Sequence, residues 1–417
     1  MSEQAAPLVR PFRGLRPAPQ YAAEVAAPPY DVVSTAEALE LVKGHPLSFL
    51  HISKPEIDLP PGTDPFAPEV YAKGAENMAA MIGDGILLRD EEPRYYVYRI
   101  GAADHVQTGI VVGGSVAAYD ANRIRRHELT QPDKEDDRVR QIEAVGAETG
   151  PVFTVHRPDA RLTEVSARAV ASAPAYEVEV AGTRHALWVV DDEAEVCAID
   201  AAFEAMDVIY IADGHHRSAA ASRVAASCAA ADPAADGTRP YDYFLIVSFP
   251  ADQVRIFDYN RVVKDLAGLE VAAFLARVAE NFDLDESAAP VKPHAPHCFG
   301  MYLGGQWYAL SLKQPPGAGA SPVARLDVSL LQERLLAPLL GIGDPRTDKR
   351  IDFIGGIRGL EGLEARVDGG EAAVAFALYP TSVADLMGVA DAGGVMPPKS
   401  TWFEPKLADG LVSLALD

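Results

Sequence analysis

Three pairs of β-rich runs, each joined by a short turn, constrain the fold of this chain most strongly. The pairs are Tyr95–Ile100 with His105–Val112, Tyr176–Val180 with His185–Val190, and Phe299–Leu303 with Trp307–Leu312. β-Branched and aromatic residues recur in these runs, and such residues fit the pleated surface of a sheet. Because segments with helical periodicity lie between the hairpins, we predict an α+β fold with mixed or antiparallel sheets, not a regular βαβ series.

The composition limits the class of protein. Hydrophobic residues make up 48% of the 417 residues, which is enough to form one large or two medium cores. The formal net charge of −23 argues against general affinity for nucleic acid or anionic membranes, which requires a basic surface. The sequence contains no apolar run of about 18 or more residues, no signal-peptide pattern at Met1–Arg10 and no C-x-x-C pair. We therefore expect a cytoplasmic protein without a membrane span; a homo-oligomer remains open.

Proline- and glycine-rich stretches suggest where the chain divides. We predict an N-terminal α+β region over residues 1–150, a central region over 151–314 and a C-terminal α+β region over 323–417. The breaks fall at Pro151 and at the Ala/Pro/Gly stretch 315–322. The N-terminal region contains a strongly polar site segment, residues 123–140, and the central region contains a strand–turn–helix pattern.

That pattern surrounds the loop Asp213-Gly214-His215-His216-Arg217. Residues 207–212 indicate a short buried strand, and the alanine-rich residues 217–231 indicate a helix. The first turn of a helix exposes unpaired N–H groups with a partial positive charge, so anions bind there readily. The position of the loop therefore predicts a phosphate-binding site.

Each residue type in the loop suits that chemistry. Gly214 lets the backbone approach an anion closely, and Arg217 can hold two phosphate oxygens at once. His215 and His216 can donate hydrogen bonds, and Asp213 can help to hold Mg²⁺. The alternative is that Asp213 only caps the helix while the histidines face solvent. A second motif, Pro28-Pro29-Tyr30-Asp31, we interpret as a structural turn, with the alternative that Asp31 lines the site.

The polar segment 123–140 is the second candidate. Twelve of its eighteen residues are charged or histidine. Phosphoryl transfer to an alcohol needs cations near the phosphates and a carboxylate that accepts the hydroxyl proton. We take Glu128, beside His127, as the candidate base, and Lys134 and Arg138 as candidate phosphate contacts. The alternative is a solvated, charged helix stabilised by pairs of charges four residues apart.

The string Ile211 to Arg217 resembles the signature of the ParB/sulfiredoxin-like superfamily, and within it that of the free serine kinases. The resemblance implies a ParB/sulfiredoxin-like core around residues 194–231. It also implies that Asp213, Gly214, His215, His216 and Arg217 bind a nucleotide phosphate. Serine kinases of this superfamily use a glutamate base.

Over nearly its whole length the chain also resembles a prokaryotic family known as domain of unknown function 1015. The matching stretches are residues 11–16 and 28–32, Arg126-His127-Glu128 with residues 134–138, the loop 213–217, and residues 396–403. Together the two resemblances imply a small-molecule kinase that uses Mg²⁺ with ATP or ADP. Its acceptor would be free L-serine or a similar hydroxyl metabolite. The alternative is a non-catalytic, nucleotide-binding regulatory protein of the ParB-like type.

Overall fold

Two compact units make up the chain. The computed structural model describes residues 7–103 and 105–417. The first unit comprises Met1–Val254 and Pro405–Asp417, and the second comprises Arg255–Glu404. The second unit is thus inserted into the sequence of the first. The three regions predicted above, with breaks at Pro151 and at 315–322, stay a prediction.

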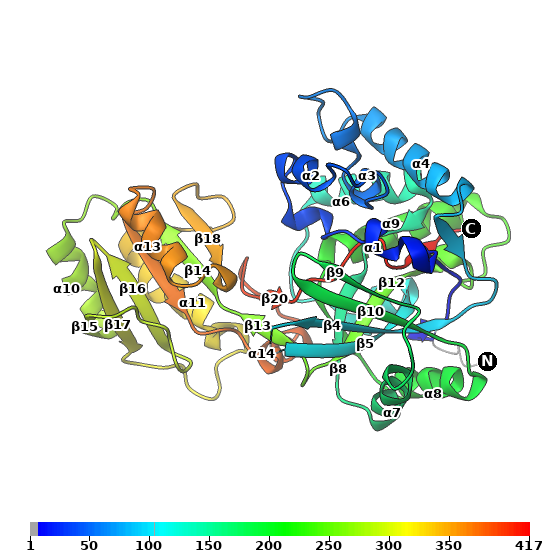
Figure 1. Ribbon diagram of the computed structural model, residues 1–417. Coiled ribbons are helices and arrows are strands. Elements are labelled where there is room, and N and C mark those ends of the chain that lie inside the picture. The colour runs from blue at the N-terminus through cyan, green and yellow to red at the C-terminus, as the bar shows by residue number, and fades with distance from the viewer. Residues whose placement is uncertain (1–6, 104) are drawn as a thin grey trace. The chain divides into compact units, whose positions relative to one another are not determined.

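A nine-stranded sheet forms the centre of the first unit (Figure 1). Its strand order is β6-β11-β8-β12-β5-β4-β10-β9, and β1 pairs with β5. The strands are β1 (Val9–Arg10), β4 (Tyr95–Ala102), β5 (His105–Ser115), β6 (Ile124–Arg125), β8 (Val152–His156), β9 (Tyr176–Val180), β10 (Thr183–Val190), β11 (Ile209–Asp213) and β12 (Tyr243–Pro250). The pairings β6–β11 and β8–β12 are parallel and the others are antiparallel. The predicted α+β fold with mixed sheets is therefore confirmed.

All three predicted hairpins are present as β4–β5, β9–β10 and β16–β17. The β9–β10 turn holds Ala181 and Gly182 at φ 48° and 77°. Gly304 and Gly305 hold the β16–β17 turn at φ 58° and 84°. A two-residue turn with positive φ at both central residues has a twist that matches that of the paired strands. This explains why the two connections can be so short.

Helices cover the sheet of the first unit on both sides (Figure 1). They are α1 (Ala22–Val25), α2 (Thr35–Leu41), α3 (Leu50–Ser53), α4 (Pro68–Gly83), α5 (Val116–Asp120), α6 (Pro132–Val145), α7 (Ala160–Val170), α8 (Glu193–Glu204) and α9 (His215–Ala231). Helices α7 and α8 lie side by side, away from the group formed by α2, α3, α4 and α6. Helix α6 packs against both α4 and α9.

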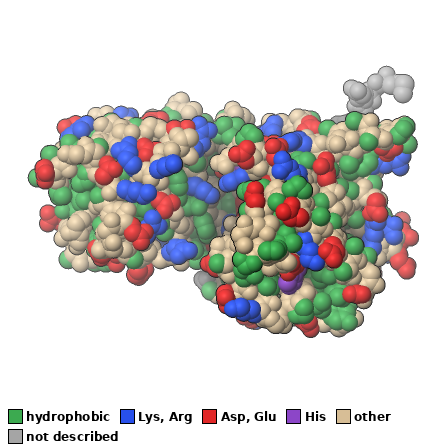
Figure 2. Space-filling view, turned by 90° about the horizontal axis from the view of Figure 1, so that it is seen from above, with side chains coloured by type: hydrophobic (Ala, Val, Ile, Leu, Met, Phe, Trp, Pro, Cys, Tyr) green, Lys and Arg blue, Asp and Glu red, His purple; other side chains and the backbone are tan. Residues whose placement is uncertain are grey.

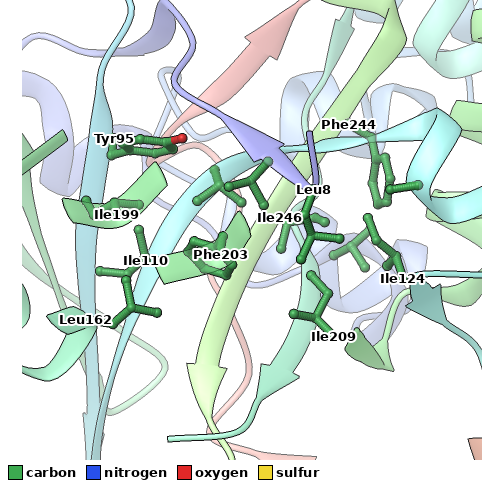
Figure 3. Packing of buried hydrophobic residues seen from close by; sticks show 14 of the residues in the cluster. Leu8, Tyr95, Ile110, Ile124, Leu162, Ile199, Phe203, Ile209, Phe244 and Ile246 are labelled. Atoms are coloured by element: carbon green, nitrogen blue, oxygen red, sulfur yellow. The ribbon is translucent and has the colours of Figure 1, made fainter. Parts of the chain in front are cut away.

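One large core packs residues of α7 and α8 against strands of the sheet (Figure 3). Phe203 of α8 and Leu162 of α7 pack there with Ile110 and Ile246 of the central strands. Full burial of one such side chain stabilises the fold by about 1.5 to 3 kcal/mol relative to exposure. Ile209 of β11 belongs to the same cluster, so this core holds the strand from which the loop 213–217 emerges.

Smaller elements complete the two units. In the first unit, a four-stranded sheet has the order β3-β2-β21-β7, with β2 (Gly14–Pro17), β3 (Leu87–Arg89), β7 (Ala147–Glu148) and β21 (Ser413–Ala415). The second unit contains an antiparallel six-stranded sheet of order β15-β17-β16-β19-β14-β18 and a β13–β20 pair. Its strands are β13 (Arg255–Phe257), β14 (Tyr259–Val263), β15 (Phe282–Ser287), β16 (Cys298–Leu303), β17 (Gln306–Leu312), β18 (Ile351–Gly355), β19 (Val374–Leu378) and β20 (Trp402–Glu404). Its helices are α10 (Val271–Asn281), α11 (Asp327–Leu331), α12 (Ala337–Leu340), α13 (Glu361–Asp368) and α14 (Val383–Asp391).

The surface carries charges of both signs. On the face drawn in Figure 2, acidic and basic side chains are interspersed over each unit. Across residues 7–103 and 105–417, no helix combines the length and apolar character that a membrane crossing demands.

Removal of the cap of α8 tests how strongly that helix depends on its first turn. The Asp192 carboxylate accepts hydrogen bonds from the backbone N–H of Ala194 and Glu195, at 2.9 and 3.0 Å. Asp192→Ala is expected to lower the free energy of unfolding by about 0.5 to 2 kcal/mol, measured by urea titration with circular dichroism. Asp191→Ala is the matched control, because Asp191 is exposed and its side chain caps no helix among the described residues. Equal losses in both variants would contradict the capping role.

Candidate functional site

The two predicted polar segments meet at one edge of the central sheet. Strand β6 runs parallel to β11, with Ile124 opposite Ile209 and Arg125 opposite Tyr210. Parallel strands end at the same edge, and open sheets of α/β proteins bind their ligands at that edge. The residues that follow β6 therefore lie beside those that follow β11. This pairing is the reason that His127 and Glu128 approach the loop 213–217.

Three side chains are in direct proximity there. The rings of His127 and His215 are perpendicular, with their centroids 4.5 Å apart. The backbone N–H of His127 donates to Nε2 of His215 at 3.5 Å. Glu128 Oε2 lies 3.9 Å from His215 Nδ1, and the Glu128 side chain is 41% exposed. Burial lowers the pKa of His127 to about 4 and that of His215 well below its usual value, so both rings are neutral at neutral pH.

Helix α9 begins earlier than the sequence pattern suggests. We predicted a start at Arg217, whereas the helix spans His215–Ala231. The reason is Gly214, which occupies the N-cap with φ 99°, a left-handed conformation that favours glycine. A Cβ at Gly214 would lie 3.2 Å from the Arg217 guanidinium and 3.3 Å from Val152 Cα. Both histidines thus belong to the first turn of the helix, and the N-cap residue is a glycine, which has no side chain to cap the backbone N–H groups.

Asp213 is held by groups on both sides. Its Oδ1 accepts a hydrogen bond from the Gly214 N–H at 2.9 Å, and its Oδ2 lies 3.2 Å from Lys406 Nζ. Burial favours a raised pKa, but the positive charges of Lys406 and Arg217 outweigh it and hold the pKa of Asp213 well below its usual range. Asp213 is therefore a carboxylate at neutral pH. Its predicted role as a metal ligand stays a prediction.

The Arg217 side chain is buried, although we predicted that it contacts a phosphate. It is 9% exposed, and its guanidinium donates a hydrogen bond to the Pro151 carbonyl. The same guanidinium lies 3.8 Å from Asp31 and 3.9 Å from Asp213. Asp31, which we interpreted as part of a structural turn, thus lies beside the loop. In this structure Arg217 ties the loop to its surroundings.

The predicted phosphate contacts on α6 differ in their positions. Arg138 stacks on Tyr30, with its guanidinium carbon 4.0 Å from the ring centroid, and pairs with Asp137 at 2.6 Å. Through Tyr30 it adjoins the Asp31–Arg217 group. Lys134 is exposed in the first turn of α6. Part of the segment therefore faces the site and part faces solvent.

His216 joins the loop to the start of α6. Its Nε2 accepts a hydrogen bond from the Gln131 N–H at 3.0 Å. The side chain is partly exposed, unlike that of His215, which is 5% exposed. The two adjacent histidines therefore have different surroundings: His215 is packed inward against His127, whereas His216 lies at the rim.

Three residues of this site were not singled out from the sequence. Lys406 follows the second unit in the chain, 193 residues after Asp213. Asp409 is buried, and its Oδ2 accepts from the Tyr30 N–H at 3.3 Å. Glu148 is buried in β7 near Arg217. No sequence signal distinguishes Asp409, because the tripeptide Ala-Asp-Gly that it shares with Asp213 also occurs at Ala235-Asp236-Gly237.

The two buried acids make a prediction about pH. Burial raises the pKa of Glu148 to about 8, although Arg217 opposes the rise. A glutamate in the unfolded chain has a pKa of about 4.3. Between this pKa and that of buried Glu148, the folded state binds more protons than the unfolded state. The stabilising contribution is therefore complete below about pH 4 and is lost as the pH rises to about 8. Asp409, whose pKa burial raises to about 7, acts in the same direction.

Glu148→Gln is expected to flatten the decline in stability between about pH 5 and pH 8, because glutamine cannot ionise. Urea midpoints at several pH values measure this slope. Glu143→Gln, a change at an exposed position of α6, is the matched control and keeps the wild-type slope. A Glu148→Gln variant with the wild-type slope would show that the buried acid does not titrate in this range.

Sequence comparison places the chain in a family. The profile described as "Protein of unknown function (DUF1015)" matches residues 9–329. The chain belongs to the DUF1015 family. This match covers the segment 123–140 and the loop 213–217, so both halves of the candidate site lie inside the family region. No curated protein matches the sequence.

Several solved structures are similar to this DUF1015 member at low identity. Free serine kinase in complex with AMP is 13% identical, with a TM-score of 0.36, covering 72% of this chain and 89% of that chain. A conserved hypothetical protein from Pyrococcus furiosus is 15% identical, with a TM-score of 0.35 and coverages of 74% and 96%. SbnI with a C-terminal truncation, from Staphylococcus aureus, is 14% identical, with a TM-score of 0.38 and coverages of 70% and 82%.

Proposed function

We propose that this chain is a nucleotide-dependent kinase that phosphorylates the hydroxyl group of a small metabolite such as free L-serine. The observation that carries the proposal is the position of Glu128 beside the first turn of α9. A half-exposed carboxylate there lies 3.9 Å from His215, the first residue of a helix whose leading N–H groups suit a phosphate. A proton acceptor and an anion site are thus neighbours, as phosphoryl transfer requires.

The remaining residues have supporting roles in this proposal. The N–H groups at the start of α9 and the rim residue His216 contact the phosphates. Gly214 permits the close approach of the backbone. Arg217 and Lys406 hold Asp213 and so fix the loop, and Arg138 adds positive charge nearby. Lys134, exposed on α6, is available to the outer phosphates.

The proposed step is an in-line transfer. The acceptor hydroxyl oxygen forms a bond to the terminal phosphorus as the bond from that phosphorus to the nucleotide oxygen breaks. Glu128 accepts the hydroxyl proton, and the nucleotide leaves with one phosphate fewer. Neutral His127 packs against the ring of His215 and holds that ring next to Glu128.

A Mg²⁺ ion would accompany the nucleotide in this proposal. Mg²⁺ prefers oxygen ligands and is commonly held by phosphates with one or two carboxylates. Asp31 and Asp213 are carboxylates beside the loop that fit this requirement, with side chains 41% and 35% exposed. The ion would supply charge neutralisation at the phosphates.

The test is a transfer assay on the purified full chain. ATP and ADP labelled in the terminal phosphate are supplied with Mg²⁺ and a pool of hydroxyl amino acids and small alcohols. Label in phosphoserine, or in another single acceptor, supports the kinase. Tight nucleotide binding with no labelled acceptor favours the non-catalytic regulatory alternative. Absence of nucleotide binding contradicts both.

A further inference from the structure

One cluster beside the loop has the composition of a metal site. His127, Glu128 and His215 each offer one ligand atom, and these atoms all lie within 4.8 Å of one another. The three side chains come from two segments that the parallel β6–β11 pairing brings together. Ligands on one transition-metal ion lie roughly 3 to 4 Å apart. Glu128 Oε2 already lies 3.9 Å from His215 Nδ1, and the Glu128 side chain is the exposed member of the set.

The orphaned nitrogen of His127 is a second, independent observation. His127 is 2% exposed, and its Nδ1 has no hydrogen-bond partner within the described residues. A buried polar atom without a partner costs about 1 to 3 kcal/mol, so its persistence calls for an explanation. The Ile211 backbone hydrogen-bonds the same ring, and the orphaned Nδ1 leaves Nε2 as the nitrogen that donates. A metal-ligating histidine commonly donates its other N–H to a backbone carbonyl in this manner.

We propose that His127, Glu128 and His215 bind a divalent transition metal, such as Zn²⁺, Mn²⁺ or Fe²⁺. Two imidazoles and one carboxylate suit these ions, whereas Mg²⁺ and Ca²⁺ prefer oxygen ligands alone. Three protein ligands leave coordination positions open on the metal. Glu128 is the solvent-accessible member of the set, whereas His127 and His215 are buried.

This metal site is separate from the Mg²⁺ that travels with a nucleotide. It goes beyond the proposed kinase function and does not depend on it, because binding needs neither nucleotide nor acceptor. The two proposals are also compatible. Glu128 would hold the metal through one carboxylate oxygen, and the metal would supply Lewis-acid polarisation of a hydroxyl bound nearby.

Cobalt titration of the full chain, after removal of metals with a chelator, tests the site. Co²⁺ bound to nitrogen and oxygen ligands at low coordination number absorbs visible light more strongly than hydrated Co²⁺. We expect one saturable site per chain, unchanged by a large excess of Mg²⁺. Glu128→Gln and His127→Gln are each expected to weaken the affinity by more than the roughly 10- to 100-fold that loss of an outer-shell partner costs.

The controls separate this site from surface binding. His51→Gln removes a histidine that also faces a carboxylate, Asp58 at 2.8 Å, outside the cluster. It is expected to keep wild-type Co²⁺ affinity. Loss of signal in His51→Gln, or wild-type affinity in the folded Glu128→Gln variant, overturns the proposal. Because the titration contains no nucleotide, its failure is independent of the transfer assay.

Discussion

Glu128→Gln is expected to lower the rate of phosphoryl transfer by about 100- to 10,000-fold while nucleotide affinity is unchanged. Glutamine keeps the shape of the side chain but cannot accept the hydroxyl proton. The phosphates would contact the first turn of α9, and Glu128 is not part of that turn. The transfer rate under single-turnover conditions and the nucleotide Kd by calorimetry measure the two effects separately.

The matched control is Glu69→Gln, which removes an exposed carboxylate from α4. It is expected to keep both the wild-type rate and the wild-type affinity. A parallel loss of rate and nucleotide affinity in Glu128→Gln would contradict the proposed role, because it would assign Glu128 to binding. Wild-type transfer would exclude Glu128 as the base.

Arg217→Met is expected to lower the free energy of unfolding by about 1 to 3 kcal/mol. Methionine retains much of the aliphatic volume but removes a buried charge that faces Asp31 and Asp213. It also removes the donor to the Pro151 carbonyl. Buried Asp409 lies in the electrostatic field of the same guanidinium. Removal of the guanidinium leaves the Pro151 carbonyl without its donor, whereas Asp213 keeps Lys406 and the carboxylates of Asp31 and Asp213 keep contact with solvent.

Arg168→Met is the comparison for this variant. Arg168 pairs with Glu195 on the surface, with its side chain 54% exposed, and exposed pairs contribute little to stability. Urea denaturation of both variants measures the difference. If Arg217→Met folds with wild-type stability and loses only nucleotide affinity, Arg217 contacts phosphate directly, as the loop motif first suggested.

Local patterns were sufficient to predict much of the fold. The β-branched and aromatic residues of β4 and β5, and the positive-φ turn between β16 and β17, are encoded within a few adjacent residues. The loop 213–217 was recognised because strand, glycine and helix follow one another along the chain. The predicted start of α9 at Arg217 was two residues too late, because Gly214 occupies the N-cap and the helix begins at His215.

The assembly of the site could not be predicted in the same way. His127 and His215 are 88 residues apart, and the strand that brings them together, β6, is two residues long. So short a strand has no periodicity to detect. Lys406 is remote in sequence from Asp213, and no composition pattern connects them. Tertiary pairing determines these contacts, and one sequence contains no direct record of it.

The insertion of residues 255–404 between the two parts of the first unit has a consequence for synthesis on the ribosome. Lys406, which balances Asp213, emerges only after the whole second unit has been translated. The same is true of β21, the strand that joins β2 to β7. A nascent chain that has reached Glu404 already holds Glu128 and His215, but Asp213 still lacks its lysine. Completion of the loop thus depends on residues that are translated after the second unit.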